Sequence, residues 1–334
     1  MSNFVIPSKI SPGDTVGVVA PSDAVDKDDI GGGIATLESW GLKVKLGKHL
    51  LAKVGDFSAG TAAERKEDLL TMIDDPMVKV IWAASGGYAA TEIIHMFTKE
   101  VITKLTASPK WFIGYSDVCV ILNALTSFKI ASIHGPNLTG LYEWDGMSQE
   151  WLKSMLFNLT EIQIDGSFQW KPIVPGTTTG NLLVSNLDSL IITLGTRYDP
   201  LMFGSGDIIL GIEEWFIEKS TLQRQFDLLV NHKRAKRIKG ILLGRFVAIE
   251  EKSYPDWGKE VTIEELIKTR SAALGDIPIA QLNDFGHYYE SDDPDMLEIK
   301  LKEGVNDSKF LSIPNGVKGK LSVGNKCTLD IYFK

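Results

Sequence analysis

Apolar runs that read as buried strands alternate with segments of helical spacing along the first third of the chain. The expected strands are Thr15–Ala20, Leu42–Leu46 and Met77–Ala84, and the expected helices are Asp28–Trp40, Thr61–Ile73 and Ala89–Phe97. This alternation predicts a parallel sheet covered by helices, because parallel strands need a long crossover connection. Ligands of such sheets bind beyond the carboxyl ends of the strands. We therefore expect the loops after Ala20, Ala84 and Tyr115 to gather at one edge.

The alternation weakens between residues 130 and 175, where prolines and turn signals are frequent. Beyond it we expect strands at Gly206–Ile212, Ile238–Phe246, Ile277–Gln281, Met296–Leu301 and Cys327–Phe333, and helices at Leu182–Leu194, Ser220–Val230 and Ile263–Ala273. We place a domain boundary in the irregular stretch. This predicts an α/β domain at residues 1–160, a linker at 161–178 and a β-rich domain at 179–334.

The 334 residues carry a net charge of −8 and only two cysteines, Cys119 and Cys327. The acidic balance argues against a nucleic-acid partner or an anionic membrane, since both select basic faces. Two distant cysteines exclude a disulfide framework and a cysteine-rich metal site. The segment Met1–Lys9 lacks the basic start and apolar core of a secretion signal, and no apolar stretch approaches about 18 residues. We therefore expect a cytoplasmic protein.

The stretch from Trp111 to Cys119 predicts a strand, a sharp turn and a helix. An apolar run ends at Gly114, Ser116 follows, and apolar residues then recur at helical spacing. A serine at that turn has its hydroxyl beside the free N–H groups of a helix N-terminus, which suits an activated nucleophile. Serine is also a common N-cap residue, so this stretch alone leaves both interpretations open.

A nucleophilic serine needs a base, most often histidine, and an acceptor that orients the base. Among the five histidines, His134 and His287 each lie beside a glycine in an expected loop, and these two are the serious candidates for the base. Glu213 follows the apolar run 208–212, which should deliver its side chain to a loop edge. A solvated carboxylate at a strand end is the alternative for Glu213.

Several motifs occur in the same order as in a known family. They are Phe57–Leu70, Asp75–Ile81, Gly86-Gly87-Tyr88, Ile113-Gly114-Tyr115-Ser116-Asp117, His134-Gly135-Pro136, Gly180-Asn181-Leu182, Leu194-Gly195-Thr196, Ile212-Glu213-Glu214, Gln223-Arg224, Gly240–Phe246 and Phe285-Gly286-His287. Together they resemble the LD-carboxypeptidases, the S66 serine peptidases, over nearly the whole chain. Each motif is weak alone, but their common order is a strong signal.

The resemblance implies a Ser-His-Glu triad of Ser116, His287 and Glu213, with an oxyanion hole from the backbone N–H groups of Gly87 and Asp117. It implies no metal and no cofactor. The implied fold is α/β, with a Rossmann-like (flavodoxin-like) parallel-sheet domain that carries the nucleophile. A β-rich, swivelling-barrel-like second domain would supply the acid and the base. The resemblance also implies a homodimer.

The resemblance implies a carboxypeptidase that releases D-alanine from a muramoyl tetrapeptide. Ser85 stands where wall-recycling members usually have an arginine before the Gly-Gly pair, and the stretch Tyr288–Leu297 is unusually acidic. An alternative is therefore the microcin-immunity branch, which cleaves aminoacyl-nucleotide conjugates. The segment Leu194–Tyr198 resembles the wall-recycling branch instead. The third hypothesis is a non-catalytic ligand-binding protein on the same scaffold, because the residues of the site, and not the fold, decide function.

Overall fold

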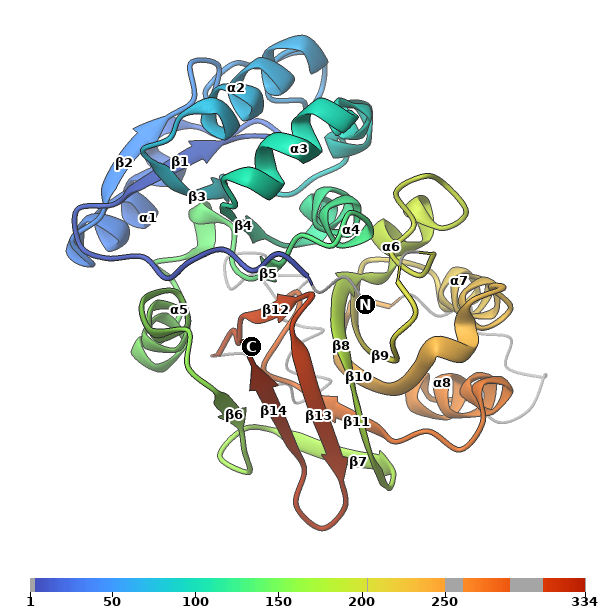
Figure 1. Cartoon of the computed structure of the whole chain (residues 1–334). Helices are drawn as coiled ribbons and strands as arrows, with labels where there is room; N and C mark the ends of the chain where they lie inside the picture. Colours follow the sequence, from blue (N-terminus) through green and yellow to red (C-terminus); the bar gives the residue numbers. More distant parts are fainter. Residues whose placement is uncertain (1–3, 203, 250–260, 289–308, 334) are drawn as a thin grey trace.

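The computed structural model of the chain describes residues 4–202, 204–249, 261–288 and 309–333, and it holds two sheets side by side (Figure 1). The strands of the first sheet are β1 (Thr15–Val19), β2 (Lys43–Leu46), β3 (Val78–Ala83), β4 (Trp111–Gly114), β5 (Ser132–His134) and β12 (Ile313–Asn315). Their order is β12-β5-β4-β3-β1-β2, and all pairs are parallel except β12 with β5. The order of the first five strands is that of flavodoxin-like sheets.

Helices cover both faces of the first sheet. The helices are α1 (Lys27–Ser39), α2 (Ala62–Asp74), α3 (Lys99–Ala107), α4 (Cys119–Ser127) and α5 (Gly146–Asn158). One core joins α1 and α5 to one face of the strands, and a second core joins α2, α3 and α4 to the other face. Burial on both faces explains why β3 and β4 are continuous apolar runs in the sequence. The predicted doubly covered parallel sheet is confirmed.

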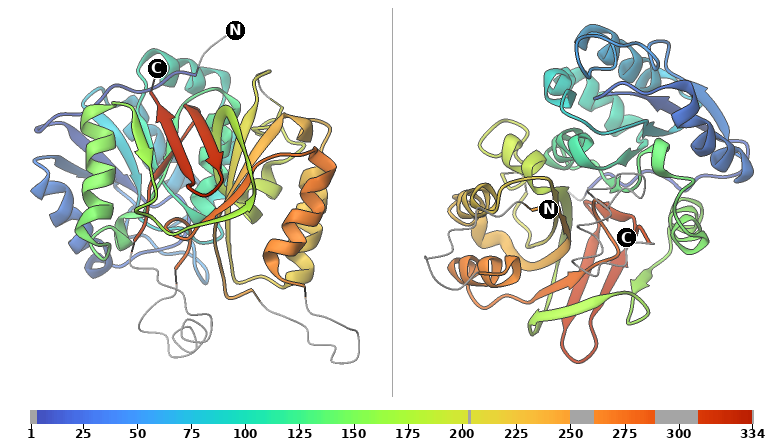
Figure 2. Two further views of the ribbon diagram at one scale, coloured as in Figure 1. Left: turned by 90° about the horizontal axis from the view of Figure 1, so that it is seen from below. Right: turned by 180° about the vertical axis from the view of Figure 1, so that it is seen from behind.

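The second sheet is mixed and has the order β6-β14-β13-β8-β9-β10-β11-β7. Its strands are β6 (Ile162–Ile164), β7 (Trp170–Val174), β8 (Gly176–Asn186), β9 (Ile208–Trp215), β10 (Ile238–Val247), β11 (Ile279–Leu282), β13 (Lys318–Val323) and β14 (Thr328–Tyr332). The helices α6 (Leu187–Thr193), α7 (Lys219–Val230) and α8 (Ile263–Ser271) share a core with one side of this sheet, and α7 and α8 lie on the outside of the molecule (Figure 2).

The helix predicted at Leu182–Leu194 is wrong in its first part. Residues 182–186 continue strand β8, and α6 begins only at Leu187. Leu182, Leu183 and Val184 are all buried, so the strand lacks the alternation that would distinguish it from a buried helix. The segment predicted as a helix at Ala89–Phe97 is a 3-10 helix, η1 (Ala90–Met96). The strand predicted at Met296–Leu301 lies outside the described residues.

The two sheets do not follow the predicted division of the chain into domains. Residues 161–178, which we predicted as a linker, contribute β6, β7 and the start of β8 to the second sheet. Strand β12, from the far end of the chain, adds to the first sheet beside β5. The limits of the two domains therefore stay a prediction. Within the described part of the chain, no helix is long and apolar enough to cross a membrane.

Candidate active site

Ser116 lies directly beyond the carboxyl end of β4, at the turn into the short 3-10 helix η2 (Ser116–Val118) and α4. Its φ of 63° is in the left-handed region, which costs a residue with a Cβ atom about 1–3 kcal/mol and is typical of functional sites. The N-cap positions of η2 and α4 are Tyr115 and Val118, so Ser116 caps neither helix. The interpretation of Ser116 as a helix N-cap is therefore wrong.

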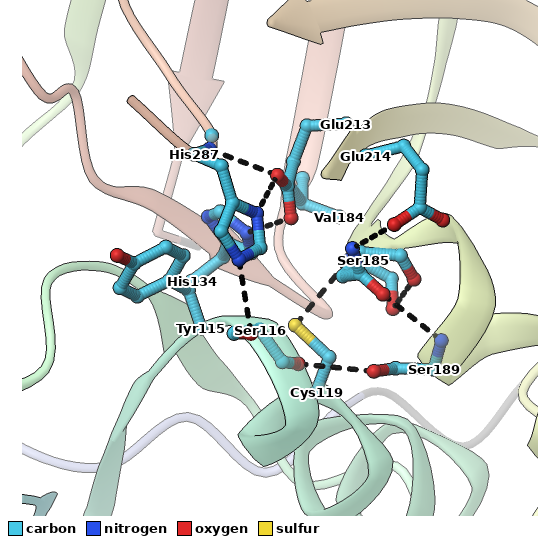
Figure 3. A network of polar contacts seen from close by, with 12 residues as sticks. Tyr115, Ser116, Cys119, His134, Val184, Ser185, Ser189, Glu213, Glu214 and His287 are labelled. Atoms are coloured by element: carbon cyan, nitrogen blue, oxygen red, sulfur yellow. Dashed lines mark hydrogen bonds and ion pairs between the residues drawn. The ribbon is translucent and has the colours of Figure 1, made fainter. Parts of the chain in front are cut away.

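The Ser116 hydroxyl instead meets His287, which comes from the loop after β11 (Figure 3). The distance between His287 Nε2 and Ser116 Oγ is 2.9 Å. The other ring nitrogen, Nδ1, lies 2.5 Å from Glu213 Oε2, and the backbone N–H of His287 donates to the same oxygen at 2.9 Å. The structure thus brings the three residues of the predicted triad into one chain of hydrogen bonds, drawn from both sheets.

Glu213 is completely buried near the end of β9. Burial alone would raise the pKa of Glu213. The neighbouring imidazoles outweigh burial: the charge interaction with His287 is the largest of their contributions, followed by the proximity of His134 and the hydrogen bond with His287, and together they hold the pKa of Glu213 well below its usual range. The side chain is therefore an ionised carboxylate and not the solvated strand-end acid considered as the alternative. An ionised acceptor of this kind favours the tautomer of His287 that has its proton on Nδ1.

Two aromatic rings contact the His287 imidazole. Trp215 is stacked on it, with ring centroids 5.6 Å apart and an interplanar angle of 10°. Tyr115 contacts it at a centroid distance of 5.0 Å. The side chain of His287 is only 10% exposed, so its orientation is set by packing as well as by Glu213.

Arg245, on β10, anchors the loop that carries His287. Its buried guanidinium donates to the carbonyl oxygens of Gly286 and His287, each at 2.6 Å. It also donates to the carbonyl oxygens of Asn283 and Lys309, each at 2.9 Å. One side chain therefore holds the chain before and after residues 289–308. The sequence identified Arg245 only as part of a motif, because nothing local shows that its partners are carbonyls 38 to 64 residues away.

The glycine loop after β3 lies against Ser116. A Cβ atom placed on Gly86 would be 2.8 Å from Ser116 Cβ, closer than Cβ atoms pack, so only glycine lets the backbone approach this closely. At Gly87, where φ is 130°, a Cβ atom would be 1.9 Å from Asp23 Cγ. The Asp23 carboxylate in turn accepts a hydrogen bond from the Tyr88 N–H at 2.9 Å. Two neighbouring glycines are thus required by their surroundings.

The side chain of Asp117 ties this glycine loop to the turn at Ser116. Asp117 Oδ2 accepts from Ser22 Oγ at 2.5 Å and from the Ala90 N–H at 2.8 Å, and Ser22 Oγ accepts from the Ala89 N–H at 3.2 Å. Burial raises the pKa of Asp117. The loops after β1, β3 and β4 therefore meet at one edge, as predicted. Sequence reasoning singled out neither Ser22 nor the side chain of Asp117.

Helix α6, which follows β8 of the second sheet, supports the turn at Ser116. Ser189 Oγ donates to the backbone carbonyl of Ser116 at 3.0 Å, and the N-cap residue Asn186 binds the buried carboxylate of Glu214 at 2.8 Å. Cys119 lies under the same turn, where it accepts from the Asn186 N–H at 3.3 Å. Burial raises the pKa of Cys119, so its thiol stays protonated and is no second nucleophile.

Glu214 should make the stability of the fold depend on pH. Burial, with the neighbouring charge of Glu213, raises the pKa of Glu214 from 4.5 to about 7. Between these values the folded chain retains a proton that the unfolded chain has lost, so the contribution of Glu214 to stability falls as pH rises through this interval. We expect Glu214→Gln, which cannot ionise, to show a flatter dependence of melting temperature on pH. Calorimetry across the interval tests this, and an unchanged slope would contradict it.

Of the four other histidines, three lie away from Ser116 and only His134 lies beside the site. His49 pairs with Glu64 and Glu67 near the surface, His232 pairs with Asp199, and His95 is exposed on η1. His134 is buried beside Glu213, with its Nε2 3.6 Å from Oε1 of that residue. No group of three metal-binding side chains occurs among the residues that the structure describes.

Comparison with known proteins identifies the family. Residues 16–135 match the model of the LD-carboxypeptidase N-terminal domain, and residues 179–292 match that of the LD-carboxypeptidase C-terminal domain. The chain belongs to the LD-carboxypeptidase family. This assignment makes it a serine-type carboxypeptidase, as the sequence predicted. A protein from Synechocystis sp. named as a carboxypeptidase is 32% identical over 85% of this chain and 90% of its own length.

Two further relatives of this LD-carboxypeptidase have names that point to different substrates. The crystal structure of a muramoyltetrapeptide carboxypeptidase from Oxalobacter formigenes covers 95% of this chain and 98% of its own, with a TM-score of 0.78 and 23% identity. The microcin C7 self-immunity protein MccF of Escherichia coli is 24% identical over 73% of this chain and 79% of its own. A structure of MccF in complex with glutamyl sulfamoyl guanosine covers 98% of both chains, with a TM-score of 0.77 and 18% identity. The structural neighbours confirm the fold.

Proposed function

We propose that this LD-carboxypeptidase hydrolyses the C-terminal amide bond of muropeptide tetrapeptides and releases D-alanine through an acyl-enzyme. The observation that carries the proposal is the hydrogen-bonded chain from Ser116 through His287 to Glu213. Nucleophile, base and acceptor are the three parts that acyl transfer by a serine requires.

In this mechanism His287 Nε2 accepts the Ser116 proton as Oγ attacks the substrate carbonyl carbon. Glu213 stabilises the imidazolium that forms, and the buried position of the pair strengthens that interaction. His287 then gives the proton to the departing amine, and the amide C–N bond breaks. Water, deprotonated by the same imidazole, hydrolyses the ester on Ser116 and restores the free enzyme.

We assign the oxyanion hole to the backbone N–H groups of Gly87 and Asp117. Support comes from the position of the Gly86-Gly87 pair against Ser116 and from the fixed place of Asp117 directly after the nucleophile. Backbone donors held rigidly before the reaction stabilise a developing oxyanion without reorganisation. The bonds from Asp117 to Ser22 and Ala90 supply that rigidity, since they join the two segments that would donate.

The identity of the substrate rests on relatives. A murein tetrapeptide carboxypeptidase of Pseudomonas aeruginosa is 33% identical over 38% of this chain and 40% of its own. The similarity to MccF and the serine at position 85, where wall-recycling members usually have arginine, favour aminoacyl-nucleotide conjugates as the second candidate substrate. We propose that the enzyme works as a homodimer in the cytoplasm, where a recycled wall fragment would reach it.

Incubation with two substrates, followed by mass spectrometry, distinguishes the candidates. We expect loss of one D-alanine from an L-lysine or diaminopimelate tetrapeptide, and the Ser116→Ala variant serves as the control. Cleavage of an aminoacyl sulfamoyl adenylate, without cleavage of the tetrapeptide, would instead identify the enzyme as a member of the microcin-immunity branch. Binding of either compound without turnover by the wild type would contradict both catalytic proposals.

A further inference from the structure

A second histidine faces the carboxylate of Glu213. His134 is the last residue of β5, where it pairs with Gly114 of β4 on one side and with Ile313 of β12 on the other. Its side chain has no exposed surface. The mechanism proposed above does not use this buried, ionisable ring, which Figure 3 shows close to the His287 ring and to the Glu213 carboxylate.

Aromatic side chains fix the plane of the His134 ring. Phe310 is stacked on it, with centroids 6.1 Å apart and an interplanar angle of 14°. Phe285 and Tyr115 meet it edge-on, each at a centroid distance of 6.0 Å. Packing of this kind leaves the ring little freedom to turn and points one nitrogen, Nε2, toward Glu213.

The two facing atoms have no other partner. Within the described part of the chain, neither His134 nitrogen nor Glu213 Oε1 has a hydrogen-bond partner, whereas Glu213 Oε2 accepts two bonds from His287. An unpaired oxygen on a buried carboxylate is costly. The distance between Nε2 and Oε1 is 3.6 Å, about 0.6 Å longer than an ordinary N–H···O bond. Such bonds at active sites are often long in unliganded structures and tighten in the working complex.

We propose that His134 is a positioning residue that donates its Nε2–H to Glu213 Oε1 and so holds the carboxylate for His287. Because an ionised carboxylate can only accept, the proton must lie on Nε2 of His134. Each oxygen of Glu213 then faces one histidine: Oε2 accepts from His287, and Oε1 accepts from His134. The inference rests on the proposed function for its effect on rate, whereas the tautomer of His134 is a property of the resting enzyme.

The first test is the tautomer of His134 in the wild-type protein, read from the ¹⁵N shifts of its ring nitrogens by NMR. We expect the proton on Nε2, and a proton on Nδ1 alone would overturn the proposal. This measurement needs no substrate and no variant. It therefore still decides the hydrogen bond if the peptidase activity proves to be absent.

The second test compares His134→Phe with His134→Gln. Phenylalanine keeps the aromatic packing without a donor, and the glutamine amide places a donor near the position of Nε2. We expect labelling of Ser116 by a fluorophosphonate to slow about 10- to 100-fold in His134→Phe, the loss typical of a hydrogen bond to a charged group, and to recover in His134→Gln. Equal labelling rates in His134→Phe and the wild type would refute the positioning role.

A spectroscopic signature separates this role from a merely structural one. The proton between His287 Nδ1 and Glu213 Oε2 should give a low-field ¹H resonance that is absent in His287→Ala. We expect it to move or broaden in His134→Phe and to persist in His134→Gln, because only the former leaves Oε1 without a donor. An unmoved resonance in a folded His134→Phe protein would contradict the proposal, as would failure of His134→Gln to retain it. Wild-type protein that shows the resonance but resists labelling would instead count against the proposed function.

Discussion

Replacing Ser116 by alanine should lower turnover by on the order of 10⁴-fold or more, because no other hydroxyl can take its place between His287 and the substrate. The fold should be retained, since alanine fits the turn and only one hydrogen bond is lost. Steady-state hydrolysis of the cleaved substrate, followed by mass spectrometry, measures the effect, and the melting temperature reports the fold.

The variants His287→Ala and Glu213→Ala should lose nearly as much activity, and the double variants little more. Residues that act as a unit lose their whole effect when one member is removed. Additive losses, or full activity of His287→Ala, would contradict the assignment of the base. The Glu213 variant should also be the least stable of the three, because it removes a buried acceptor from the His287 backbone N–H.

Gly87→Ala should reduce kcat by about 10²- to 10³-fold, the cost of losing one oxyanion donor. The added methyl group would lie 1.9 Å from Asp23 Cγ, and the φ of 130° is unfavourable for alanine. The loop must therefore shift and carry its N–H away from the position of the oxyanion. Separate measurement of kcat and KM tests this, with kcat expected to change far more than KM.

Gly275→Ala provides the matched control. Gly275 also has a left-handed φ, 107°, but a Cβ atom there would meet nothing within 4 Å, and its loop lies in the second half of the chain after α8. This variant should lose stability through backbone strain and keep its activity. If both variants lose activity equally, the effect of Gly87→Ala reflects general destabilisation and not the oxyanion hole.

The first sheet could be predicted because each of its longer strands has a signal in its own short stretch of sequence. Strands β1 and β3 are short apolar runs bounded by turn residues, and periodicity identifies both directly. The residue at the strand-to-helix turn, Ser116, could be found for the same reason. Its left-handed φ could not, because the backbone at that position is determined by Gly86, Ser189 and the other loops that surround it.

The parts that escaped prediction depend on contacts between distant segments. Strand β12 has only three residues and exists because it pairs with β5, about 180 residues earlier in the chain. His134 was expected in a loop, since a glycine and a proline follow it, yet it ends β5 under a stack of aromatic rings. Neither its burial nor its approach to Glu213 has a signal in the neighbouring sequence.

The four carbonyls that Arg245 binds have a consequence for how His287 keeps its distance from Glu213. The guanidinium holds the carbonyls of residues 283, 286, 287 and 309. Arg245 lies on β10, the strand next to β9, which carries Glu213. The histidine and its acceptor are thus placed by neighbouring strands of one sheet, and only the approach of Ser116 depends on how the two sheets meet.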